Sequence, residues 1–136
     1  MIDSKNTGKE ASVDGRSPCP VACCLDLLGD KWTLLVVRDL LLGKTTYSEF
    51  QKSPEGIPTN ILAERLKRLL AAGVIEKSRY QERPKRYAYH LTAKGSDLRQ
   101  VLSSMIDWGN KYIPGTVTRE QIEAMAPQLK EKGSVS

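Results

Sequence analysis

The sequence has few of the residue types that build catalytic or metal sites. Among its 136 residues there are one histidine and three cysteines. Cys23 and Cys24 are adjacent, which is not the usual spacing of a zinc ligand pair, and His90 falls in an expected strand. The chain also lacks a glycine-rich phosphate loop and any Ser/His/Asp or Cys/His spacing typical of a nucleophile. We therefore expect no metal site, no cofactor and no enzymatic activity.

Long apolar segments are missing as well. No run approaches the roughly 18 to 20 apolar residues that cross a bilayer, and the N-terminus lacks the apolar centre of a secretory signal. The cysteines are clustered and odd in number, which fits reduced thiols better than a disulfide framework. These absences predict a cytoplasmic protein that has no membrane partner.

The charge balance is basic. The 21 Lys and Arg residues outnumber the 16 Asp and Glu residues, which gives a net charge of +5 and a pI of about 9.2. An excess of this sign favours a polyanionic partner. The length fits one domain with a modest core, and both ends are polar. We expect a flexible tail over residues 1–17, one folded unit over 18–113 and an extension over 114–136.

The stretch over residues 57–92 carries the strongest structural signal. Leu62, Leu66 and Leu69 recur at helical spacing and share one face, and Gly73 is a natural helix terminator. Residues 74–80 and 86–91 then read as two strands, because apolar and polar side chains alternate around a basic break at 81–85. A helix that leads into a basic hairpin is typical of a winged helix-turn-helix.

The rest of the chain supplies further helices. Three are expected upstream, over residues 21–28, 32–42 and 47–52, and Thr46 with Glu49 forms a capping box for the third. A turn over residues 53–56 separates that helix from the one at 58–72, which completes the helix-turn-helix. A weaker helix is expected over 118–130. The predicted fold class is mostly α with a small β-hairpin (α+β).

A long helix over residues 93–112, capped by Thr92, has an apolar stripe larger than the hairpin needs to cover it. The stripe contains Leu98, Leu102, Met105, Ile106 and Trp108. It either belongs to an intramolecular core or forms a dimer interface together with the first helix. We favour the dimer, since DNA-reading proteins of this type usually pair.

A set of short motifs in a fixed order resembles one known family. These are Cys19-Pro20, LLGDKW at 27–32, YSEF at 47–50, Gly56-Ile57, LAERL at 62–66, GVI at 73–75, Pro84, YHLT at 89–92, Gly95 and Trp108. Over residues 19–113 the chain resembles the HxlR-type regulators, bacterial dimeric winged-helix transcription factors related to the MarR group. The resemblance implies a sequence-specific DNA-binding regulator whose first and last long helices dimerise. Some family members sense electrophiles or oxidants through the cysteine that matches Cys19.

The function that follows is binding of double-stranded DNA at a palindromic operator by a homodimer. The helix over 58–72 would enter the major groove, and the wing over 81–86 would lie on the flanking minor groove or backbone. The candidate DNA-binding residues are Thr59, Asn60, Glu64, Arg65, Lys67, Arg68, Arg83, Lys85 and Arg86. The alternative function is a winged-helix module for protein interaction without specific DNA readout, which has no need of a basic helix and wing.

Several of these residues have a second interpretation that the sequence leaves open. The basic side chains could form an ordinary solvated surface, Thr59 could only cap its helix, and Arg65 could pair with an acid. Cys19 could respond to an oxidant or electrophile, or it could only pack at the start of the first helix. For Cys23 and Cys24 we expect buried packing positions.

Overall fold

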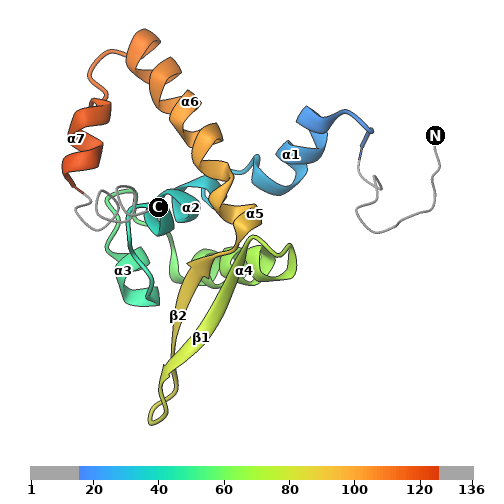
Figure 1. The fold of residues 1–136 in the computed structure, drawn as a ribbon, viewed down its shortest axis with the longest axis vertical. Helices are drawn as coiled ribbons and strands as arrows, with labels where there is room; N and C mark the ends of the chain where they lie inside the picture. The colour runs from blue at the N-terminus through green and yellow to red at the C-terminus, as the bar shows by residue number, and fades with distance from the viewer. Residues whose placement is uncertain (1–15, 126–136) are drawn as a thin grey trace.

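The computed structural model describes residues 16–125, and this part of the chain is mostly helical with one antiparallel hairpin (Figure 1). The predicted fold class is confirmed. No helix within the described residues is long and apolar enough to cross a membrane. The elements are α1 (Pro20–Leu28), α2 (Thr33–Leu41), α3 (Tyr47–Gln51), α4 (Thr59–Ala71), β1 (Ile75–Gln81), β2 (Arg86–Leu91), α5 (Ala93–Ser96), α6 (Leu98–Tyr112) and α7 (Arg119–Ala124).

The core lies where α2, α3 and α4 meet the start of the hairpin. Phe50, Leu62 and Leu69 are fully buried there, as the spacing of the leucines predicts. Burying one such side chain contributes about 1.5 to 3 kcal/mol. The ring of Tyr89 from β2 packs against Phe50, with 6.2 Å between the ring centroids. The hairpin is therefore anchored in the same core as the helix-turn-helix.

The loop between α2 and α3 also holds the hairpin in place. The backbone N–H of Tyr89 donates to the carbonyl of Thr45 at 2.7 Å, and Thr46 bridges Ala88 in antiparallel fashion. Because α3 begins at the next residue, the position of the wing is tied to that of the helix-turn-helix. Figure 1 shows the hairpin extending from its base beside α4 well beyond the helices.

The prediction of a single helix over residues 93–112 is wrong, because the structure divides this segment at Asp97 into α5 and α6. The cause is long-range contact: the Thr92 hydroxyl donates to the Gly73 carbonyl at 2.6 Å, and Lys94 Nζ donates to the Ala72 carbonyl at 2.7 Å. A Cβ on Gly95 would lie 2.1 Å from the Val74 carbonyl oxygen. These contacts hold α5 against the end of α4, whereas α6 packs on α2.

The last helix of the described part of the chain is α7. Thr118 and Gln121 form a capping box for α7, which ends at Ala124, and residues 126–130 of the expected helix lie outside the described part of the chain. Arg119 Nη2 donates to the Ser103 hydroxyl at 2.9 Å and to Asp107 Oδ1 at 2.7 Å. These contacts place α7 alongside α6 (Figure 1).

Candidate nucleic-acid interface

The orientation of α4 depends on a carboxylate at the corner between α1 and α2. Asp30 Oδ2 accepts the backbone N–H groups of Trp32 and Thr33 at 2.9 and 3.1 Å, which satisfies free donors at the start of α2. The same oxygen accepts Arg65 Nε at 2.8 Å. Arg68 Nη2 donates to the Leu27 carbonyl at 2.6 Å. Two arginines of α4 thus point inward and hold the helix against the α1–α2 corner.

The charge state of Asp30 reflects these contacts. Burial would raise the pKa of Asp30, but the hydrogen bonds from the Thr33 hydroxyl, Arg65 and the Trp32 N–H outweigh it and hold the pKa well below its usual range. The hydrogen bond with Asp30 in turn raises the pKa of Arg65. Asp30 is therefore ionised and paired at neutral pH.

The first turn of α4 is positioned by α3. Tyr47 Oη donates to the Thr59 carbonyl at 2.8 Å, and Gln51 Nε2 donates to the Thr59 hydroxyl at 3.2 Å. The predicted capping box of α3 is confirmed, with Glu49 Oε1 accepting the N–H groups of Thr45 and Thr46 at 2.8 and 3.0 Å. The Thr45 N–H is the main reason why the pKa of Glu49 is lowered. These hydrogen bonds connect α3 to the first turn of α4 and to the α2–α3 loop.

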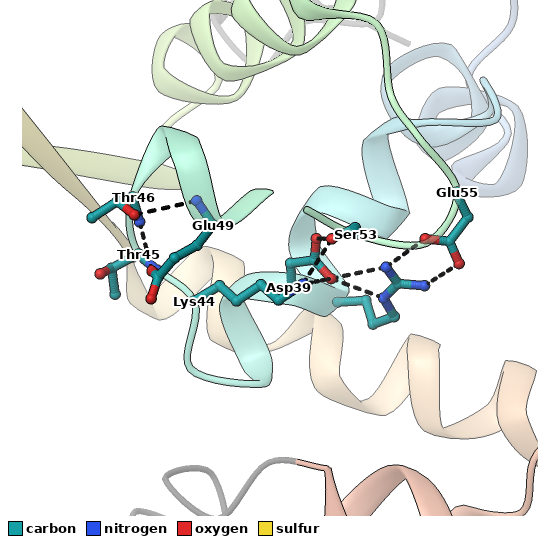
Figure 2. A network of polar contacts seen from close by, with 8 residues as sticks. Asp39, Lys44, Thr45, Thr46, Glu49, Ser53 and Glu55 are labelled. Carbon is teal, nitrogen blue, oxygen red and sulfur yellow. Dashed lines mark hydrogen bonds and ion pairs between the residues drawn. The ribbon is translucent and has the colours of Figure 1, made fainter. Parts of the chain in front are cut away.

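A polar network centred on the buried Asp39 holds the turn between α3 and α4 (Figure 2). Asp39 is buried, at 3% exposure, and its carboxylate accepts the Ser53 hydroxyl and Arg38 Nη2, the latter at 2.8 Å. Arg38 also binds both carboxylate oxygens of Glu55, at 2.7 and 2.9 Å. Lys44 Nζ donates to the Ser53 hydroxyl at 2.8 Å. Since Ser53 and Glu55 belong to the turn, the network fixes the approach to α4.

The sequence analysis missed this network, although one signal was present. Asp39 stands among apolar residues of α2, at a position that faces the core, and a buried charge requires a partner. The hydrogen bond to Glu55 is the main cause that raises the pKa of Arg38, and the same bond lowers the pKa of Glu55. An aspartate among apolar residues indicates that it needs a hydrogen-bonding partner. It does not identify partners such as Ser53, which are distant in the sequence.

Seven of the nine candidate DNA-binding residues lie on exposed surface: Thr59, Asn60, Glu64 and Lys67 on α4, and Arg83, Lys85 and Arg86 on the wing. The other two, Arg65 and Arg68, make the inward contacts described above, so the acid-pairing alternative for Arg65 is the one observed. None of the ion pairs between described residues includes Lys67 or the three basic wing residues. The first turn of α4 also has no side-chain cap. The surface therefore presents unpaired positive charge on two elements.

The cysteines lie along the first helix. Cys19 precedes α1 and is exposed, and Cys23 is half-buried with its thiol donating to the Ser17 carbonyl at 3.3 Å. The prediction that Cys24 is buried is wrong, because its side chain is exposed in the single chain. Within residues 16–125 there is no group of three or more His, Cys, Asp and Glu side chains that could hold a metal ion.

The predicted dimer residues divide between two sides of α6. Leu98 and Leu102 pack against the core, and Ile106 is half-buried. Met105 and Trp108 are exposed, the latter at 61%. Other exposed apolar side chains are Val101, Tyr112 and Ile113 on or directly after α6, and Val21 and Leu25 on α1. We call the exposed side chains of α6 and α1 the apolar stripe.

Comparison with known proteins identifies the family of this chain. Residues 27–117 match the model of the HxlR-like helix-turn-helix family. The chain belongs to the HxlR family. Two relatives carry the name of uncharacterized HTH-type transcriptional regulators. YdeP of Bacillus subtilis is 35% identical over 109 residues, 80% of this chain and 85% of that protein. Rv3095 of Mycobacterium tuberculosis is 33% identical over 94 residues, and the match spans 69% of this chain but 59% of that protein.

Solved structures share the fold of this HxlR-family chain. PA1607 is 40% identical with a TM-score of 0.66, over 75% of this chain and 72% of that one. The reduced form of the transcriptional regulator YodB from Bacillus subtilis is 30% identical with a TM-score of 0.60, over 73% and 98%. The redox regulator HypR in its oxidized form is 30% identical with a TM-score of 0.63, over 68% and 96%. The protein is a transcriptional regulator that carries a helix-turn-helix.

The Asp30 contacts yield a prediction about stability and pH. Asp30→Asn keeps an acceptor for the start of α2 but removes the charge that Arg65 pairs with, so we expect a loss of about 1 to 3 kcal/mol of unfolding free energy at pH 7. A lowered folded-state pKa stabilises the wild type above the unfolded-state value of about 3.9, and this contribution is lost as pH falls below it. In urea titrations at several pH values, the free energy of unfolding of the variant should therefore fall less between neutral and acid pH than that of the wild type.

A matched control is Asp26→Asn, because Asp26 pairs with Arg16 on the exposed surface at 2.9 Å. Its removal should change stability by no more than about 0.5 kcal/mol. Equal effects of the two substitutions would contradict the role given to Asp30.

Proposed function

We propose that this regulator reads double-stranded DNA as a homodimer, with α4 in the major groove and the wing over residues 81–86 on the flanking minor groove or backbone. The observation that carries the proposal is the exposed, unpaired positive charge of Lys67 on α4 and of Arg83, Lys85 and Arg86 on the wing. Such charges bind phosphates and release counterions. The uncapped first turn of α4 adds free N–H groups that favour an anion.

The polar residues of α4 divide by role. Thr59, Asn60 and Glu64 lie on the exposed face near the start of the helix, where a recognition helix contacts base edges. Asn60 can bind adenine with two hydrogen bonds, and Glu64 can accept from cytosine. Arg65 and Arg68 act from inside, by orienting α4. The wing then supplies affinity, and α4 supplies base preference.

The alternative, a winged-helix module that binds a protein, is less well supported. A fold does not determine function, so a winged helix can bind a protein instead of DNA. A module of that kind has no need of a basic face on both α4 and the wing. Retention on heparin and on random duplex, followed by a salt gradient, distinguishes the two. Retention of Lys85→Ala equal to that of the wild type would favour the module.

The division of roles predicts two different mutant phenotypes. Lys85→Ala should weaken binding to every duplex and lower the salt slope by about 0.9 per lost phosphate contact. Asn60→Ala should leave the salt slope nearly unchanged. It should remove about 1 to 3 kcal/mol of discrimination between bases at one position of the site. The measurement is affinity against salt for a duplex selected from a random library and for a scrambled one.

Lys111→Ala serves as the control in this experiment. Lys111 is an exposed lysine in the last turn of α6. Figure 1 shows that this end of α6 points away from the hairpin. Its removal should change neither the salt slope nor the base preference. If Asn60→Ala lost the same affinity for both duplexes, base reading by Asn60 would be wrong.

Dimerisation through the apolar stripe completes the proposal. Exposed apolar patches of this kind mark interaction surfaces, and Met105 and Trp108 lie on the same side of α6 as Val101 and Tyr112. Pairing of two copies would set two α4 helices roughly 34 Å apart, which is the spacing of successive major grooves on one side of the duplex. A palindromic operator follows from the two-fold symmetry.

Sedimentation at micromolar concentration checks the dimer. The wild type should sediment as a dimer, and Met105→Asp should sediment as a monomer, because an unpaired carboxylate in an apolar interface is costly. Ala124→Asp places the same charge on an exposed position of α7 and should remain a dimer. A wild-type monomer, with and without duplex, would overturn this part of the proposal.

An oxidant or electrophile acting at Cys19 is a second element of the proposed function. Cys19 is exposed and precedes α1, which belongs to the apolar stripe, so its modification would alter the dimer and the spacing of the two α4 helices. The neighbour HypR is named as a redox regulator. Diamide should change operator affinity in the wild type and in Cys24→Ser but not in Cys19→Ser. Equal responses in all three proteins would leave Cys19 a packing residue.

A further inference from the structure

One face of the hairpin carries a lysine that the sequence analysis did not select. In the register of the hairpin, Lys77 stands opposite Tyr89, and the next pair outward on the same face joins Arg79 and Tyr87. Tyr89 packs against Phe50 of α3, so this face is turned toward the helix-turn-helix. We call the face with these four hairpin residues the inner face. Lys77 is exposed on it, whereas Tyr87 is half-buried.

An aromatic ring holds the Lys77 ammonium group. Lys77 Nζ lies 4.5 Å from the centroid of the Tyr87 ring, which is its diagonal neighbour across the hairpin. The ring quadrupole attracts a cation in this position. Because Tyr87 is nearer the tip than Tyr89, the lysine side chain extends outward along the hairpin. The contact also restricts the rotamers of Lys77, so less side-chain entropy is lost when the ammonium group binds an anion.

Lys77 is the more available of the two cations at this ring. The Cζ atom of Arg79 lies 5.9 Å from the same ring centroid, but its Nη1 atom already binds Glu82 Oε1 at 3.1 Å. Lys77 takes part in none of the ion pairs between residues 16 and 125. Glu76, its neighbour in the chain, alternates onto the opposite face, where it pairs in register with His90. The ammonium group is therefore free for an external anion.

We propose that Lys77 binds a phosphate of the duplex and that Tyr87 is the positioning residue that directs it there. The inference rests on the proposed function, in which α4 and the wing contact one duplex. Figure 1 shows the outer part of the hairpin standing clear of the helices. Because the inner face is turned toward the helix-turn-helix, a duplex held by α4 and the wing tip lies on the Lys77 side. The wing thus contacts the backbone along a strand as well as at its tip.

The salt dependence of duplex affinity tests the phosphate contact. Lys77→Ala should lower the slope of log affinity against log salt by about 0.9, on a selected and on a scrambled duplex alike. Lys111→Ala is the matched control, because Lys111 Nζ also lies over a tyrosine ring, that of Tyr112 at 5.3 Å, in the last turn of α6. Its slope should equal that of the wild type. An equal slope for Lys77→Ala and the wild type would overturn the proposal.

A double-mutant cycle tests the role of Tyr87. Tyr87→Leu keeps an apolar side chain but removes the ring, so duplex affinity should fall by about two- to fivefold. Tyr87→Phe keeps the ring and should bind as the wild type does. In a Lys77→Ala background, Tyr87→Leu should have no further effect, because the residue that it positions is gone. The same loss with and without Lys77 would overturn the positioning role and leave Tyr87 a packing residue.

A measurement without DNA separates this inference from the proposed function. In NMR spectra of the full chain, the ring current of Tyr87 should shift the Lys77 side-chain resonances upfield in the wild type and in Tyr87→Phe, but not in Tyr87→Leu. No shift in the wild type would overturn the positioning role. A salt slope that falls for Lys85→Ala but not for Lys77→Ala would overturn the phosphate contact and leave the proposed function intact. A wild type that bound no duplex would overturn both.

Discussion

The Asp30 carboxylate connects three parts of the molecule at one point. It satisfies N–H groups at the start of α2, pairs with Arg65 of α4, and lies 3.9 Å from Arg68. The leucines of α4 are buried in the core, but hydrophobic contact has no preferred direction. The ion pair has one, so it fixes the rotation of α4 about its axis and with it the residues that face outward.

Basic residues thus have two different environments in this winged helix-turn-helix. Arginines of α4 face the protein, whereas the basic residues of the wing face solvent with no acidic partner among the described residues. Arg79 is an intermediate case, since it pairs with Glu82 at 3.1 Å on the exposed hairpin. The exposed candidate residues of α4 are Thr59, Asn60, Glu64 and Lys67, so this helix presents both uncharged and charged side chains.

The long helix α6 has apolar residues on more than one side. One side packs on α2, and the other belongs to the exposed apolar stripe. The exposed side is the surface on which the proposed dimerisation depends. The two sides are neighbouring faces of α6: Leu98 and Leu102 lie on one, and Met105 and Trp108 lie on the other.

Local physical chemistry determined much of the architecture from the sequence alone. The three- and four-residue spacing of Leu62, Leu66 and Leu69, the capping box of Thr46 and Glu49, and the alternation along the hairpin each involve residues that are close in the chain. Such signals depend on the backbone geometry of one element, so the helices and strands were predictable. The exposed face of the wing followed for the same reason.

Tertiary structure decided which way particular side chains point. The pairing of Arg65 with Asp30 spans 35 residues, the bond from Arg38 to Glu55 spans 17, and the division of the last long helix follows from contacts of α5 with the end of α4. A charged residue on a helix surface has the same local signature whether its partner is a phosphate or a distant carboxylate. Only the packing of whole elements brings one partner within reach and excludes the other.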